Sequence, residues 1–248
     1  METSREQAII RALVEMADNL VENFDVVDLL TSLAGRCVHL LGVSAAGVMI
    51  NVPSHGLRLV ASSSEELQVV ELFELQADEG PSLEAFHSGE AIEQARLRSR
   101  SEHWPRFSEV AVAAGYLSVC ALPLRLRDST IGALSMFSVE HSPMDEGDLR
   151  IARALADLAT ISILQHGEAM EGHRLNEHLS TVLATRVVIE QAKGVISERA
   201  GIDVSEAFVR LLSYARSDAR HLADVARSAI DGTLDARAWA APPAVDGR

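Results

Sequence analysis

The stretch SVCALPLRLRDSTIGALSMFSV, residues 118–139, contains two strand-like runs around a short polar turn. Apolar and β-branched residues dominate Ser118–Arg125 and Thr130–Val139, and Arg127-Asp128-Ser129 separates them. Runs of this length, joined by a few polar residues, predict an antiparallel hairpin. The stretch therefore predicts a fold that contains an antiparallel sheet.

The chain upstream of this hairpin alternates between helical and strand-like patterns. A second strand pair, Ala45–Val52 and Leu57–Ser62, surrounds Pro53-Ser54-His55-Gly56, and Ala91–Ala95 is a short strand. Apolar periodicity and capping residues predict helices over Ser4–Leu20, Asp25–Leu41, Glu65–Leu75, Pro81–Phe86 and Trp104–Ala114. Helices around an antiparallel sheet describe an α+β domain.

A long helical pattern follows, from Asp145 to Arg199, without a proline to stop it. Apolar and long side chains recur at spacings of 4, 3, 4 and 3, at Leu175, Leu179, Val182, Arg186 and Ile189. These spacings are those of a coiled-coil seam, and they predict a homodimer through the long helix. The alternative is one amphipathic helix packed on its own domain, because the seam is shorter than three heptads.

The C-terminal part predicts a small three-helix bundle. Gly201 ends the long helix, Asp203 caps a second helix, and Ser217 or Asp218 caps a third that ends at Gly232. We therefore expect an α+β domain over residues 1–166 and a helical linker over 167–185. A three-helix domain over 186–232, its first helix starting near residue 175, and a flexible tail over 233–248 complete the chain.

Composition limits the cellular setting and the partners. The net charge is −14, but residues 186–232 hold seven basic and seven acidic side chains, and Lys193 is the only lysine of the chain. We see no signal peptide and no apolar run long enough to span a bilayer. Cys37 and Cys120 are isolated cysteines, which indicates buried, reduced thiols rather than a disulfide framework. We expect a cytoplasmic protein with no membrane partner.

Residues 186–208, RVVIEQAKGVISERAGIDVSEAF, resemble the ANTAR domain, an RNA-binding module of bacterial antitermination regulators. The resemblance covers about residues 175–232 and implies that the partner is RNA with paired short hairpins. The sequence departs from the family pattern at Ser197, at Leu212, where arginine is common, and at Ala219. The residues expected to contact RNA are Arg186, Gln191, Lys193, Gly194, Arg199, Arg210, Tyr214, Arg216 and Arg220.

Two of these residues have a competing structural interpretation. A glycine inside a helix costs about 1 kcal/mol against alanine, so Gly194 predicts that another backbone approaches closely. That backbone belongs either to RNA or to a neighbouring helix. Lys193 is accordingly either a phosphate contact or a contributor to helix packing.

The N-terminal part resembles a GAF domain, most clearly in DEGPSLEA at Asp78–Ala85, in Trp104–Phe107 and in Ser118–Leu126. The whole chain is thus similar to the GAF–ANTAR regulators of actinobacteria. The resemblance and the helix start at Gly80-Pro81-Ser82 suggest a small-molecule or anion site. Its candidate residues are Phe73, Gly80, Ser82, Phe86, Tyr116 and Phe137. The alternative, which the periodicity favours, is that the aromatic residues are core.

The sequence predicts a regulator that is not an enzyme and needs no cofactor. The histidines and cysteines lack metal-ligand spacing, and no phosphate-binding or nucleophile motif occurs. The function expected is a signal-responsive RNA-binding antitermination or translational regulator. The alternatives are a dimeric protein-interaction or sensor module without RNA binding and, more remotely, a GAF-based redox enzyme.

Overall fold

The computed structural model describes residues 2–18, 25–52, 56–98, 101–127, 129–165, 173–218 and 220–234. Within these ranges, the side chains of residues 2–4, 18, 173–186, 205 and 216 lie outside the description. The chain divides into two compact units, Met1–Ser180 and Thr181–Arg248.

The first unit is built on a five-stranded antiparallel sheet with the strand order β2-β1-β5-β4-β3. The central pair is β1 and β5, in which Gly47 is paired with Ser135. The short strand β3 pairs with only the first part of β4. The strands are β1 (Ala45–Val52), β2 (Gly56–Ser62), β3 (Ile92–Gln94), β4 (Ser118–Leu126) and β5 (Ser129–Ser138).

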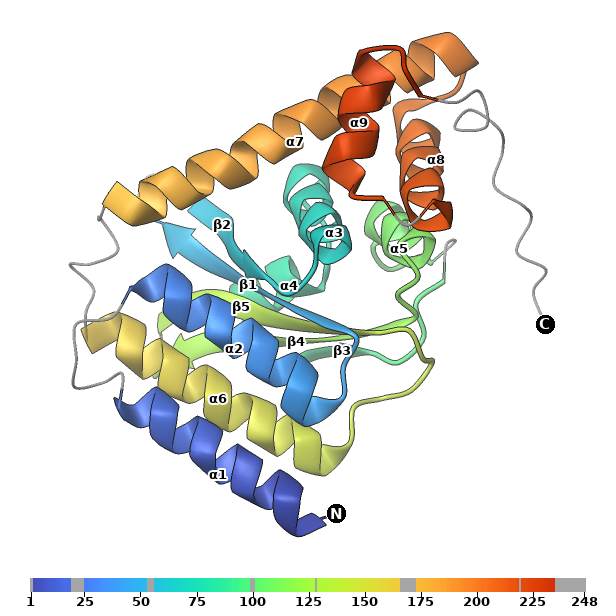
Figure 1. Ribbon diagram of the computed structural model, residues 1–248. Helices are drawn as coiled ribbons and strands as arrows, with labels where there is room; N and C mark the ends of the chain where they lie inside the picture. The colour runs from blue at the N-terminus through green and yellow to red at the C-terminus, as the bar shows by residue number, and fades with distance from the viewer. Residues whose placement is uncertain are drawn as a thin grey trace. The chain divides into compact units, whose positions relative to one another are not determined.

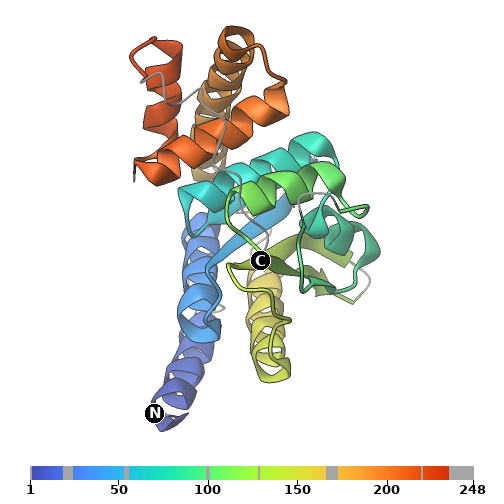
Figure 2. The same cartoon turned by 90° about the vertical axis from the view of Figure 1, so that its right-hand side faces the viewer.

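Helices cover both faces of this sheet (Figure 1). On one face, α2 (Val26–Leu41) and α6 (Glu146–Gln165) pack on the strands, and α1 (Glu2–Asp18) packs on these two helices. On the other face lie α3 (Glu65–Ala77), α4 (Pro81–Ser88) and α5 (Pro105–Ala113). The helices α3 and α5 lie side by side, as Figure 2 shows from a second direction.

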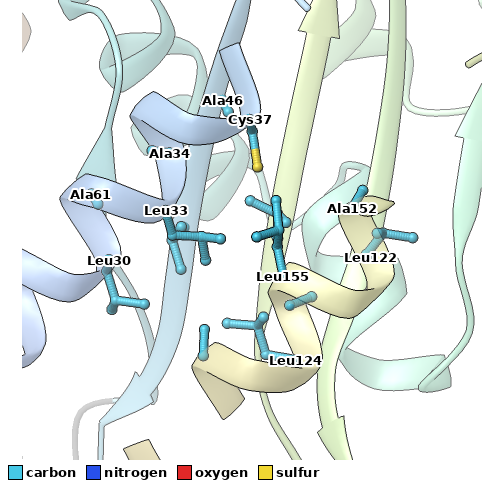
Figure 3. Close-up of a cluster of buried hydrophobic side chains, with 14 of the residues drawn as sticks. Leu30, Leu33, Ala34, Cys37, Ala46, Ala61, Leu122, Leu124, Ala152 and Leu155 are labelled. Atoms are coloured by element: carbon cyan, nitrogen blue, oxygen red, sulfur yellow. The ribbon is translucent and has the colours of Figure 1, made fainter. Parts of the chain in front are cut away.

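The main hydrophobic core lies between the sheet and the α2–α6 layer. Figure 3 shows Leu33 and Cys37 of α2 and Leu155 of α6 meeting Leu122 and Leu124 of β4. These side chains are buried, and each comes from the apolar face of an amphipathic helix or from one face of a strand. The apolar periodicity read from the sequence is therefore what attaches these helices to the sheet.

Local capping explains why the first-unit helices begin and end where they do. Asp25 accepts a hydrogen bond of 2.8 Å from the backbone N–H of Val27 at the start of α2, and Gly42 ends that helix with φ of 67°. Ser64 accepts one of 3.2 Å from the N–H of Leu67 at the start of α3. Such side-chain oxygens satisfy N–H groups that have no partner inside the helix.

The fold class and the strand positions predicted from the sequence are confirmed. The predicted bounds of β1 are those observed, and β2, β4 and β5 differ from prediction by one residue at one or both ends. The continuous helix predicted from Asp145 to Arg199 instead appears as α6 and α7 (His173–Ala200). Residues 166–172 between them, including Gly167 and Gly172, lie outside the described residues, so continuity stays a prediction.

The second unit contains the C-terminal part of α7 together with α8 (Val204–Ser217) and α9 (Leu222–Ile230). Gly201, with φ of 64°, follows α7, and Asp203 accepts a hydrogen bond of 3.0 Å from the N–H of Glu206. The third helix is capped later than predicted. Its N-cap is His221 rather than Ser217 or Asp218, because α8 continues through Ser217.

Candidate functional site

The three helices of the second unit enclose an apolar core that fixes which side chains remain at the surface. Ile189, Ala192 and Ile196 of α7 are buried, as are Phe208 and Leu211 of α8. From α9, buried apolar residues at helical spacing complete the core: Leu222, Val225, Ala226 and Ala229. Ile189 was also predicted to end a dimer seam, but its 3% exposure shows that it is already buried within a single chain.

Lys193 lies in this core. Its side chain is 3% exposed, and its Nζ donates to Glu190 Oε1 at 2.9 Å and to Oε2 at 3.1 Å. The same Nζ lies 5.2 Å from the ring centroid of Phe208 on α8. A compact ammonium group placed over an aromatic face is stabilised electrostatically, and burial strengthens that attraction. In this arrangement Lys193 joins α7 to α8, which favours the packing interpretation over the phosphate contact.

One face of α7 is exposed. Val187, Gln191, Gly194 and Glu198 all lie at the surface, and their spacings of four, three and four residues place them on one side of the helix. A Cβ added at Gly194 would have no atom of the described residues within 4 Å, apart from its own stretch of helix. Packing inside the chain therefore gives no reason for a glycine at this position. We call these four residues the α7 face.

The remaining predicted RNA contacts are distributed over the unit. Arg199 is exposed, and its Nη1 donates a hydrogen bond of 3.5 Å to the carbonyl oxygen of Ala229. Arg210 forms an ion pair with Glu206 within α8, with 2.8 Å between Nε and Oε1. Arg220 is exposed and donates to Ser228 Oγ at 3.1 Å.

The predicted contacts are thus only partly brought together. Gln191 and Gly194 share the α7 face, whereas Tyr214 is buried, with 8% of its surface exposed. The side chains of Arg186 and Arg216 lie outside the described residues. Leu212, where the ANTAR resemblance leads us to expect arginine, is fully buried, so it belongs to the core rather than to the surface.

In the first unit, the six residues predicted to line a ligand pocket are spread over several packing clusters. Tyr116 and Phe137 are buried with ring centroids 5.1 Å apart. Phe73 is buried beneath the guanidinium of Arg106, which lies 5.8 Å from its ring centroid, and Phe86 packs on an alanine cluster. None of the six lines either of two hollows that occur on this unit. The aromatic residues of this set pack within the domain: Phe73, Tyr116 and Phe137 are buried, and Phe86 is partly buried.

The anion predicted at the start of α4 is present, and it belongs to the chain itself. The Glu74 carboxylate accepts hydrogen bonds from the N–H groups of Ser82 and Leu83 at 2.6 and 3.0 Å. The Ser82 hydroxyl donates to it at 3.0 Å. A Cβ at Gly80 would lie 2.5 Å from the Glu74 side chain, so the absence of a Cβ at Gly80 leaves space for Glu74. The helix N-terminus that the sequence offers to a ligand is occupied by Glu74.

Both Glu74 and Glu71 are fully buried on the inner face of α3. Burial raises the pKa of Glu74 to about 7, against the hydrogen bonds from Ser82 and Leu83 that lower it. Burial also raises the pKa of Glu71 well above its usual range. The Ser135 hydroxyl lowers that pKa, and the charge of Glu74 raises it. Burial therefore favours the neutral carboxyl group at Glu71, whereas Glu74, with a pKa of about 7, is partly ionised near neutral pH.

Glu71 rests directly on the centre of the sheet. The Ser135 hydroxyl donates to its Oε1, and its Oε2 is buried without a hydrogen-bond partner among the described residues. Gly47 on the neighbouring strand lacks the Cβ that would overlap both carboxylate oxygens.

Sequence reasoning missed this pair of glutamates. The available signal was that Glu71 and Glu74 follow the buried Leu67 by four and seven residues, on the apolar face of the predicted helix.

Comparison with known protein families decides the identity of both units. The model of the GAF domain family matches residues 25–163, and that of the ANTAR domain matches residues 177–230. The chain belongs to the GAF family. It combines a GAF domain with a C-terminal ANTAR domain.

A solved structure shares the fold of the GAF domain. The GAF domain from a phosphoenolpyruvate-protein phosphotransferase of Coxiella burnetii is 18% identical, with a TM-score of 0.51. That comparison covers 66% of this chain and 97% of that one. The corresponding domain from Acinetobacter is 14% identical, with a TM-score of 0.48, and covers 64% and 94%. No curated protein matches the chain. At 18% identity, the likeness to the Coxiella burnetii domain shows the fold alone.

The two domains define the chain in general terms as a sensor-regulated antitermination regulator. Neither is a catalytic domain. Cys37 and Cys120 are both buried and unpaired, and burial raises the pKa of each thiol to about 12. Thiols that stay protonated are poor nucleophiles, which disfavours a redox role for them.

The parts of the chain that the structure describes contain no cluster of three or more potential metal-ligating His, Cys, Asp or Glu side chains. The helices described there also lack the combination of length and apolar character needed to cross a bilayer.

Proposed function

We propose that the GAF domain senses a ligand or partner and that the ANTAR domain binds RNA carrying short hairpins, so that antitermination responds to the signal. The observation that supports RNA binding most directly is the open space around Gly194. A mid-helix glycine costs about 1 kcal/mol against alanine, and among the residues that the structure describes no packing contact at Gly194 offsets that cost. A close external partner is the remaining reason for it.

RNA fits the α7 face better than an apolar partner does. Gln191 supplies both a donor and an acceptor, and Gly194 lets a ribose-phosphate backbone approach the helix closely. The exposed cations Arg199 and Arg220 lie elsewhere on the same small domain. Because the domain is neutral overall, we expect binding that depends on few phosphate contacts and therefore weakens only moderately as salt is raised.

The second candidate is a protein-interaction module. Val187 is 53% exposed at one end of the α7 face, and Val204 is 46% exposed at the start of α8. Exposed apolar side chains on a chain with a net charge of −14 are compatible with a protein partner. The homodimer predicted through Leu175, Leu179 and Val182 is a further proposal, because those side chains lie outside the described residues.

Fluorescence anisotropy with labelled RNA separates the two candidates. The full chain is titrated at low salt into an RNA with two short hairpins and into a mutated RNA of equal length that cannot form them. We expect saturable binding to the hairpin RNA and at least about tenfold weaker binding to the other, since folded RNA is recognised through its shape and loops. Absence of binding to the hairpin RNA at low salt would contradict the proposal and favour the protein-interaction module.

A further inference from the structure

A hollow of about 310 Å³ lies beside the second half of β4 in the GAF domain. Strand β3 pairs with β4 only over residues 119–121, so among the described strands the part from Leu122 onward has a neighbour on one side only, β5. Pro123, which has no N–H to leave unpaired, lies at this open edge. The walls are the loop after α4, the β4–β5 turn and α6. We call this space the β4-edge hollow.

Three arginines from different elements line the β4-edge hollow: Arg125, Arg127 and Arg153. Arg125 is fixed, because its Nε donates to the carbonyl oxygen of Arg127 at 2.6 Å and its Nη1 to that of Gly89 at 3.1 Å. Arg127 occupies the turn with φ of 55° and is exposed. Arg153 projects from α6 and is also exposed.

Two carboxylates share the hollow with these arginines. Glu90 Oε1 lies 3.9 Å from Arg125 Nη1, at the rim. Asp157 follows Arg153 by one helical turn. Burial raises the pKa of Asp157, and the positive charge of Arg153 works against that rise. The lining therefore carries one more positive than negative charge.

This arginine cluster stands out against the charge of the domain around it. Residues 25–163 contain ten arginines and nineteen acidic residues, yet the hollow gathers three of those arginines against two acids. Guanidinium groups present several N–H donors in one plane, which suits the oxygens of a phosphate group. A volume of about 310 Å³ is at the lower end of the range of small-molecule sites.

We propose that the β4-edge hollow binds the phosphate group of a small phosphorylated molecule. Such a ligand would join Arg153 of α6 to the β4–β5 turn. The ligand sensed by the GAF domain would then be a phosphorylated small molecule. That regulatory role of the site rests on the sensor function proposed above. Phosphate binding is measured without RNA, so its failure can be distinguished from a failure of the proposed RNA-binding function.

Isothermal titration of the full chain with inorganic pyrophosphate tests the site. We expect saturable binding that weakens as sodium chloride is raised, and about tenfold weaker binding in Arg153→Gln and in Arg127→Gln, since each removes charge-assisted donors. Arg150→Gln is the matched control. Arg150 is exposed on α6, one turn before Arg153, and does not line the hollow. The control should bind as the wild type does.

Several outcomes would overturn the proposal. One is no binding by the wild type at millimolar pyrophosphate, and another is an equal loss in Arg150→Gln, which would indicate general charge attraction. Displacement of pyrophosphate by the hairpin RNA would assign the arginines to RNA instead. Circular dichroism checks that each variant folds. If one does not, NMR shifts at the backbone amides of Ala91 and Ala156 on adding pyrophosphate to the wild type give the same test.

Discussion

The ammonium group of Lys193 on α7 lies 5.2 Å from the ring centroid of Phe208 on α8, and it is held there by Glu190. The only lysine of the chain is thus part of the ANTAR core rather than a free surface charge. A guanidinium is larger and flat, which explains why arginine, common everywhere else in the sequence, is not equivalent at this position.

Lys193→Ala should destabilise the ANTAR domain. The substitution removes the contact with Phe208 and leaves a space in the core, so we expect a loss of about 2 kcal/mol in the free energy of unfolding. Lys193→Met keeps most of the side-chain volume and should lose less. Urea unfolding followed by circular dichroism measures both. Unchanged stability in Lys193→Ala, together with lost RNA binding, would restore Lys193 as a direct phosphate contact.

Gly47→Ala should destabilise the GAF domain, because the new Cβ would overlap the buried carboxylate of Glu71. We expect a cost of about 2 kcal/mol, as for other overpacked cores. The contact between Gly47 and Glu71 can be tested with the double variant Gly47→Ala with Glu71→Ala. Without the Glu71 carboxylate the overlap is gone, so the double variant should recover part of the lost stability. If the two effects simply add, the proposed contact between these residues is wrong.

The stability of the GAF domain should fall as pH rises from about 4.5 to about 7, through Glu74. Its pKa is about 7 in the folded state, against 4.5 when unperturbed, so in this window the folded protein holds a proton that the unfolded chain has lost. The contribution is complete below pH 4.5 and is lost as pH passes the folded pKa, a change of about 3 kcal/mol.

Glu74→Gln isolates this effect. The amide is uncharged at every pH, and its oxygen still accepts from the two N–H groups at the start of α4. The difference in unfolding free energy between wild type and variant should therefore shift across pH 4.5–7. Urea unfolding at several pH values measures it. A difference that is constant with pH would show that Glu74 does not titrate in this range.

Arg220→Gln should weaken RNA binding more than Arg227→Gln does. Both arginines are exposed on or next to α9, but Arg227 forms an ion pair with Asp224 at 2.9 Å, and only Arg220 was predicted as an RNA contact. We expect the salt dependence of log Kd to decrease by about one unit in Arg220→Gln alone. Anisotropy titrations at several salt concentrations measure this slope. Equal slopes in the two variants would contradict the assignment of Arg220.

The sequence predicted the fold well because its elements follow local rules. Strand β1 is an almost continuous apolar run with turn residues on both sides. Asp25, Gly42, Gly201 and Asp203 mark helix ends by their own side chains or backbone freedom. The later start of α9 was missed because Ser217 and Asp218 are preferred N-cap residue types, whereas the observed N-cap, His221, is not one and makes no side-chain capping hydrogen bond.

The candidate sites were less predictable because they depend on contacts between distant residues. Nothing local reveals that Glu74 reaches the N-terminus of α4 eight residues away, or that Lys193 meets Phe208 across two helices. Likewise, Arg125 and Arg153 come together only through the packing of α6 on β4. In these cases burial and pairing required the tertiary structure.

The most direct measurement of the central claim compares RNA binding by the wild type, Gly194→Ala and Gly194→Leu. Both substitutions favour the helix by up to about 1 kcal/mol, so the fold is kept or strengthened. We expect affinity for the hairpin RNA to decrease in the alanine variant and to be lost in the leucine variant, while Thr233→Leu, at another exposed position, binds as the wild type does. Full affinity in Gly194→Leu would contradict RNA recognition through the α7 face.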